Sequence, residues 1–181
     1  MLQPKPQRLL FFFCLCGFAL AATTPAIWLD VPFIKQEKDG CGAASIAMVM
    51  QYWAQHQSRS AEKAADATVI LGQLHSSKEH GIRASEVERY FQQHGFRTFA
   101  FSGKWSDLQE HLEKGRPLLV AIKPSALETV LHYVVVVGID PEQNIVYVND
   151  AAQRKLLKQE RASFEKQWTA VGNWTLLALP Q

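Results

Sequence analysis

A cysteine at the start of a predicted helix has the position best suited to chemistry in this sequence. Cys41 stands in the segment Asp39-Gly40-Cys41-Gly42-Ala43-Ala44-Ser45, between an extended run and an apolar run with helical spacing. The first turn of a helix offers unpaired N–H groups and the positive end of the helix dipole, and both favour a thiolate. Since the thiolate is the nucleophilic form, the position predicts a reactive thiol. Gly40 and Gly42 are expected to let a substrate approach the backbone closely.

A cysteine nucleophile needs a base, and His132 is the best candidate among six histidines. It opens the most apolar run of the chain, where a buried ring must have hydrogen-bond partners. A structural histidine with satisfied partners is the alternative, but a cysteine on a helix start upstream favours the general base. The other five histidines lie in polar loops or on charged helix faces, where solvent-exposed roles are expected: His56, His75, His80, His94 and His111.

The imidazole in turn needs a group that fixes its tautomer. Asp150 ends the strand that follows the predicted hairpin, so the register can bring it beside His132. Asn149 is adjacent and could serve instead, but side chains alternate along a strand, so only one of the two should face the base. We predict Asp150 in this role. The alternative for Asp150 is a strand-end aspartate that bonds its own backbone.

A tetrahedral intermediate would also need hydrogen-bond donors for its oxyanion. The Cys41 backbone N–H is one candidate, and the amide of Gln36, in the preceding turn, is the second. Gln36 could equally be a solvated loop residue. Asp39 is expected to cap the helix rather than act as a catalytic acid.

The composition is that of an ordinary globular domain. The chain has 181 residues, 48% hydrophobic and 20% charged, which predicts one domain with a core that needs no disulfide or metal. The formal charge of +2 gives no indication of a nucleic-acid or anionic-membrane partner. No cofactor is expected.

The first residues have the character of an export signal. Lys5 and Arg8 precede an apolar run over 9–20, and Ala19-Leu20-Ala21 fits a cleavage site, so we predict a signal peptide over 1–21. The alternative is that the segment stays uncleaved as a membrane anchor. A lipoprotein is not predicted, because neither Cys14 nor Cys16 follows a small residue. Cleavage would remove two of the 19 basic residues, so the mature protein would have 17 basic and 17 acidic residues. It would also remove two of the three cysteines and leave Cys41. We expect a periplasmic or secreted protein without strong membrane binding.

The elements that must position these groups predict an α+β domain over 29–179. Helices are expected over 43–53, 60–74, 85–94, 104–113 and 163–167, and strands over 29–34, 96–101, 117–122, 131–139, 145–148 and 174–179. The helices come mainly first and an antiparallel sheet follows, so the site is expected in a cleft between the two parts.

Several motifs, in this order, resemble the bacteriocin-processing (double-glycine leader) peptidase family of papain-like cysteine peptidases: Val31-Pro32-Phe33-Ile34-Lys35-Gln36, Cys41-Gly42-Ala43-Ala44-Ser45, His132-Tyr133-Val134-Val135-Val136-Val137-Gly138 and Val148-Asn149-Asp150. The resemblance implies a papain-like fold, with an N-terminal helical lobe packed on an antiparallel sheet. It implies a catalytic set of Cys41 as nucleophile, His132 as base, Asp150 as orienting residue and Gln36 in the oxyanion hole.

The combined prediction is an exported cysteine peptidase that hydrolyses peptide bonds of a peptide or protein substrate. An acyl or peptidyl transferase with the same residues is one alternative, and a catalytically silent papain-like domain that binds peptides is another. The sequence does not identify the substrate, and the resemblance does not imply that this chain cuts a double-glycine leader.

Overall fold

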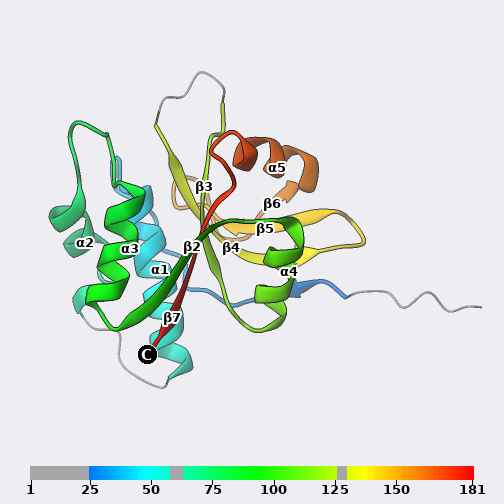
Figure 1. The fold of residues 1–181 in the computed structure, drawn as a ribbon, viewed down its shortest axis with the longest axis horizontal. Helices are drawn as coiled ribbons and strands as arrows, with labels where there is room; N and C mark the ends of the chain where they lie inside the picture. The colour runs from blue at the N-terminus through cyan, green and yellow to red at the C-terminus, as the bar shows by residue number, and fades with distance from the viewer. Residues whose placement is uncertain (1–24, 58–62, 126–129) are drawn as a thin grey trace, which may run out of the picture.

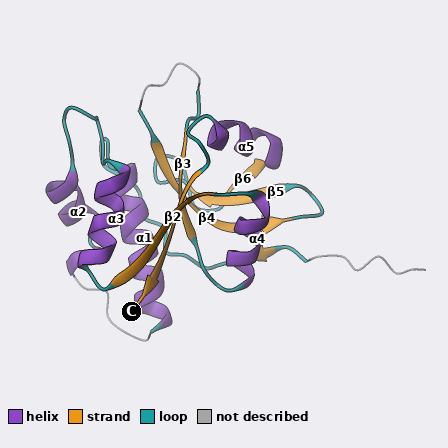
Figure 2. Cartoon of the chain, viewed as in Figure 1, coloured by secondary structure: helices purple, strands orange, loops and turns teal. Residues whose placement is uncertain are grey.

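The computed structural model describes residues 25–57, 63–125 and 130–181. Five α-helices and a seven-stranded antiparallel sheet make up this part (Figures 1 and 2). The helices are α1 (Cys41–His56), α2 (Ala67–Leu74), α3 (Ala84–Gln93), α4 (Trp105–Glu113) and α5 (Arg161–Thr169), with a short 3-10 helix, η1 (Lys63–Ala65). The strands are β1 (Ile27–Trp28), β2 (Phe96–Ser102), β3 (Leu118–Ile122), β4 (His132–Asp140), β5 (Ile145–Asn149), β6 (Leu157–Glu160) and β7 (Trp174–Pro180).

The sheet has the order β2-β7-β3-β4-β5-β6, and β1 pairs with β4 outside this path. Helices α1 to α3 cover one part of the sheet and form the N-terminal helical lobe, while α4 and α5 pack on the other side (Figure 1). The α+β prediction of a helical lobe on an antiparallel sheet is therefore confirmed. The predicted signal peptide over 1–21 lies outside the described residues.

Strand β4 is buried on both faces, which explains its uninterrupted run of valines. Val135 and Val137 belong to the core shared with α1, whereas Val134 and Val136 belong to the core beneath α4 and α5. Because each face has its own helices, no position from Val134 to Val137 needs a polar side chain, and the usual alternation disappears there. The prediction of a central strand is confirmed here.

Helix α1 is the best-buried helix, and every residue of its first ten is buried. Small residues such as Ala43, Ala44 and Ala47 let its axis come close to the sheet, and they are good helix formers. A helix held so firmly gives its first residue a fixed place relative to β4. None of the helices in the described residues has the length and apolar character needed to cross a bilayer.

Some predicted boundaries are wrong. The segment over 29–34 is not a strand, although the Leu29 N–H still donates to the Val137 carbonyl at 2.7 Å. The helix expected over 60–74 is divided into η1 and α2, and Asp66 caps α2 by accepting from the N–H groups of Thr68 and Val69. Residue 60 itself lies outside the described residues.

Candidate active site

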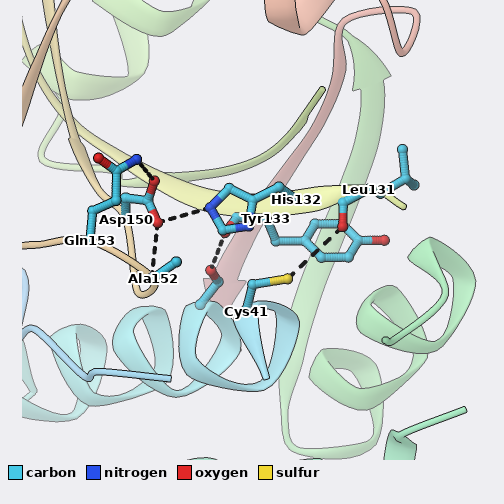
Figure 3. Close-up of polar contacts among 8 residues, drawn as sticks. Cys41, Leu131, His132, Tyr133, Asp150, Ala152 and Gln153 are labelled. Atoms are coloured by element: carbon cyan, nitrogen blue, oxygen red, sulfur yellow. Dashed lines mark hydrogen bonds and ion pairs between the residues drawn. The ribbon is translucent and has the colours of Figure 1, made fainter. Parts of the chain in front are cut away.

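Cys41 is the first residue of α1 and faces the start of β4. Its side chain is buried, and its Sγ lies 4.0 Å from the carbonyl oxygen of Leu131, the residue before His132. The two segments are ninety residues apart in the chain and meet where the helical lobe contacts the sheet (Figure 3). The fold therefore brings the cysteine and histidine predicted from sequence to the same place.

His132 lies between Cys41 and Asp150 (Figure 3). Its Nε2 is 2.8 Å from Asp150 Oδ1, and 16% of its side chain is exposed. That hydrogen bond leaves Nδ1 on the side of the thiol. Burial opposes a charge on the ring, but hydrogen bonds to Asp150 and Cys41 and the charges of both raise the pKa of His132 to about 10. The ring is therefore an imidazolium at neutral pH.

Asp150 is held by three donors and is only 1% exposed. Besides His132, the Ala152 N–H donates to Oδ1 at 2.9 Å, and Gln153 Nε2 donates to Oδ2 at 2.7 Å. Burial raises the pKa of Asp150, but the hydrogen bond and charge of His132, with the Ala152 and Gln153 donors, more than offset this and lower it. The carboxylate is therefore charged at neutral pH, opposite a charged imidazole.

Asn149 does not contact the imidazole. Its side chain is fully buried, with Nδ2 donating to the Val31 carbonyl at 3.2 Å and Oδ1 accepting from the Leu156 N–H at 3.0 Å. Both bonds hold neighbouring chain segments against β5. Of the two residues that sequence reasoning considered, the structure thus places Asp150 beside His132 and gives Asn149 a structural position.

Gln36 lies in the loop before α1 and lines the same cleft as Cys41. Its backbone N–H donates to the Ala151 carbonyl at 3.0 Å, which ties this loop to the turn after Asp150. Its buried Oε1 has no hydrogen-bond partner among the described residues. Gln36 is therefore half-buried in the cleft that contains the thiol, and its unpartnered atom there is an acceptor.

The roles expected for the residues around Cys41 need two corrections. Asp39 does not cap α1, because the capping position is Gly40 and no side chain bonds there; Asp39 instead adopts a positive φ of 56° and lines the cleft. Gly42 does not face a substrate. A Cβ at that position would lie 3.2 Å from Ile82 Cβ and from Tyr133 Cδ2, so this glycine allows close packing of the core.

These groups line one cleft of about 340 Å³ at the junction of the helical lobe and the sheet. Its lining contains all four predicted site residues and several others: Gln36, Asp39, Cys41, His80, Pro124, Val130, Leu131, His132, Asp150, Ala152 and Gln153. Of the histidines expected at the surface, His80 is exposed at the edge of this cleft, whereas His111 is half-buried. No group of three metal-ligating side chains occurs in the described part of the chain.

Sequence reasoning missed Gln153, which fixes the second oxygen of Asp150. The available signal was its position three residues after an aspartate at a strand end. A turn of that length returns the chain toward the carboxylate, as the bond from the Gln153 N–H to the Asp150 carbonyl at 3.0 Å shows.

Comparison with known proteins identifies relatives across most of the chain. The model of the peptidase C39-like family matches residues 28–176. Among solved structures, a candidate C39-like peptidase from Bacillus anthracis has 18% identity and a TM-score of 0.68, covering 87% of this chain and 99% of its own. The peptidase domain of Streptococcus ComA, a bifunctional ABC transporter of a quorum-sensing pathway, has 20% identity and a TM-score of 0.64, with coverage of 82% and 98%.

A third solved structure is a double glycine motif protease from an AMS/PCAT transporter, in complex with its leader peptide. It has 22% identity and a TM-score of 0.63, and covers 85% of this chain and 94% of its own. At these identities the structures establish a shared fold. No curated protein matches the sequence.

Proposed function

Since the chain belongs to the peptidase C39-like family and is a cysteine peptidase of papain-like fold, we propose that Cys41, His132 and Asp150 are its catalytic triad. The observation that carries this proposal is the placement of one imidazole between a buried carboxylate, 2.8 Å from Nε2, and a thiol at the start of α1. An imidazolium held by a carboxylate stabilises a neighbouring thiolate, which is the form that attacks a carbonyl carbon.

The reaction follows from these positions. The Cys41 thiolate attacks the scissile carbonyl carbon, and the oxyanion is stabilised by the Cys41 N–H and the Gln36 amide. When the intermediate collapses, the C–N bond breaks and His132 gives its Nδ1 proton to the leaving amine. The neutral ring then takes a proton from water, whose oxygen attacks the thioester. Collapse breaks the C–S bond, releases the carboxylic acid product and regenerates the thiolate and imidazolium.

Asp150 serves this cycle by holding the imidazole through Nε2. Its own carboxylate is fixed by Ala152 and Gln153, so the ring cannot rotate without breaking a buried charge-assisted hydrogen bond. Gln36 is attached through its backbone to the same turn. The acid and the proposed oxyanion donor are therefore positioned by one short segment, 150–153.

The substrate is proposed to be a peptide or protein. The cleft is open along the junction of the lobes, and a similar protease has been captured with its leader peptide. The apolar segment over 9–20 supports export, so the substrate is expected in the periplasm or outside the cell. Export is tested by expressing the full chain and sequencing the N-terminus of the exported protein; a start at residue 22 or 23 is expected, and retention in the cytoplasm would contradict it.

The activity is tested with the protein lacking residues 1–21 and a library of peptides from digested bacterial proteins. Wild type should generate new termini detected by mass spectrometry, and Cys41→Ala should generate none while it unfolds in urea like wild type. Hydrolysis and transfer are separated by adding glycinamide: a hydrolase yields free carboxyl termini, whereas a transferase yields amide adducts. Equal cleavage by Cys41→Ala would refute the proposal.

Reactivity of the thiol provides a second test that needs no substrate. Iodoacetamide should alkylate Cys41 at pH 6 at least tenfold faster than it alkylates glutathione, since an ordinary thiol has a pKa of about 8.5 and is mostly protonated there. A catalytically silent domain would show no such excess.

A further inference from the structure

An apolar pocket adjoins the catalytic cleft. It has a volume of about 390 Å³ and shares Val130 and Leu131 with the cleft that contains Cys41. Ala84, at the start of α3, is the contribution of the helical lobe, and the other lining residues belong to the sheet or to the loops beside it: Ala121, Lys123, Val130, Leu131, Ala170, Val171 and Trp174. Because the two cavities share Val130 and Leu131, this pocket continues the catalytic cleft rather than forming a separate site.

The entrance of the apolar pocket has an unusual surface. Four large apolar side chains are exposed within the described residues: Trp28, Phe99, Val130 and Leu131. The last two, at 36% and 40% exposure, are consecutive in sequence, line both cavities and immediately precede His132. Adjacent exposed apolar side chains beside a reactive centre indicate a surface that becomes covered when a ligand binds.

The chemistry of the lining selects an apolar occupant. Among the described residues that line the pocket, Lys123 is the one with a charge, and Trp174 contributes an aromatic wall. Trp174 is itself held edge-on against the Tyr133 ring, with ring centroids 5.7 Å apart. Ala84 and Ala121 contribute only methyl groups, which leaves the space between the walls open for a side chain.

The pocket is also close to the reacting atom. Leu131 is one of the residues that line the pocket, and its carbonyl oxygen lies 4.0 Å from Cys41 Sγ. An extended peptide advances about 3.3 Å per residue, so a side chain one or two residues from the scissile carbonyl reaches the pocket. We propose, on the premise of the peptidase function above, that this apolar pocket binds a bulky apolar substrate side chain within two residues of the scissile bond.

The consequence is a preference against small residues at that position. A substrate glycine leaves the pocket empty. The side chain of a leucine, methionine or phenylalanine would fill it, and both that side chain and the exposed Val130 and Leu131 would then be shielded from water. Burial of one such side chain corresponds to about tenfold or more in kcat/KM. The preferred cleavage site should therefore have a bulky apolar residue within two residues of the scissile bond. A site with only glycines at these positions should be cleaved more slowly.

Two chloroacetamides test the pocket without requiring turnover. N-benzyl- and N-methylchloroacetamide alkylate Cys41 by the same chemistry, but only the first carries an apolar group long enough to enter the pocket. The rate of the benzyl reagent divided by that of the methyl reagent should be at least tenfold higher for Cys41 than for glutathione. Ala84→Phe, which fills the pocket, and Val171→Arg, which makes its rim polar, should each bring this ratio near the glutathione value.

Ala100→Phe is the matched control, because Ala100 is exposed on β2 and takes the same substitution outside the pocket. It should keep the wild-type ratio. A wild-type ratio equal to that of glutathione, or an equal loss in Ala100→Phe and Ala84→Phe, would overturn the proposal. Uniformly slow alkylation by both reagents would instead argue against the peptidase mechanism, and the ratio would still report on the pocket.

Discussion

Replacing Gln153 by alanine tests whether the turn after β5 holds the triad carboxylate. The lost bond, from Nε2 to Asp150 Oδ2 at 2.7 Å, ends on a charged oxygen of a residue that is 1% exposed. Removing a charge-assisted hydrogen bond at a buried group costs about 1.5–3 kcal/mol, so the free energy of unfolding should fall by that amount at pH 7. Urea unfolding measures this difference.

The effect should depend on pH with a definite sign. Asp150 has a folded-state pKa below its unfolded value, so its contribution to stability is complete above an unfolded pKa of about 3.9 and is lost as the pH falls through the folded pKa. Gln153→Ala should raise the pKa of Asp150 in the folded protein. The difference in the free energy of unfolding between the variant and wild type should therefore narrow as the pH falls far enough to protonate Asp150 in both proteins. Gln153→Glu should destabilise more at pH 7, since it puts a second carboxylate beside Asp150.

Gln109→Ala provides the matched control. Gln109 donates from the same atom type to the carboxylate of Glu113 at 2.9 Å, but on the exposed surface of α4. Its loss should cost no more than about 0.5 kcal/mol. Activity adds a readout that general destabilisation does not give: Gln153→Ala should lower kcat about tenfold with little change in KM. Equal destabilisation by the two alanine variants, or a pH-independent gap, would refute the reasoning.

Three further substitutions test other parts of the site. Asp150→Asn should reduce kcat by about a hundredfold or more, since it removes the carboxylate that fixes the ring; the same kcat in both proteins would contradict this. Gln36→Ala should lower kcat by about a hundredfold while alkylation of Cys41 keeps its wild-type rate, and a parallel loss of both would indicate a structural role. Gly42→Ala should destabilise the fold by about 1–3 kcal/mol in urea, because its new methyl group meets the Ile82 and Tyr133 side chains.

The features that could be predicted from the sequence have a strong local signal. Helix α1 has small and apolar residues at helical spacing, and the valine run of β4 can belong only to a segment with apolar contacts on every side. Cys41 and His132 stood out because each occupies an end of one of these two elements. The sequence around each residue did not predict that the two lie close together. That prediction depended on the assumption that a free cysteine and a buried histidine form a pair.

The features that were missed depend on contacts distant in sequence. Strand β6 has the sequence Leu-Lys-Gln-Glu, which carries little strand signal, and it exists because β5 offers an edge for pairing. Gly42 seemed to be a place for substrate because its neighbour Ile82 comes forty residues later and could not be anticipated. The sequence favoured Asp150 over Asn149 without showing what Asn149 does; its role depends on Val31 and Leu156, which hold its amide.

The central claim is that Cys41 and His132 share a proton while Asp150 holds the ring, and an NMR titration of His132 tests it most directly. With nitrogen-labelled histidine, the wild-type ring should stay doubly protonated at neutral pH and lose its proton near the pKa of about 10. In Cys41→Ala the titration should move to lower pH, because the thiol's hydrogen bond and charge are gone. The account would be contradicted if the His132 ring of the wild type titrated near the ordinary value of about 6.5. It would also be contradicted if the ring titrated at the same pH in wild type and Cys41→Ala.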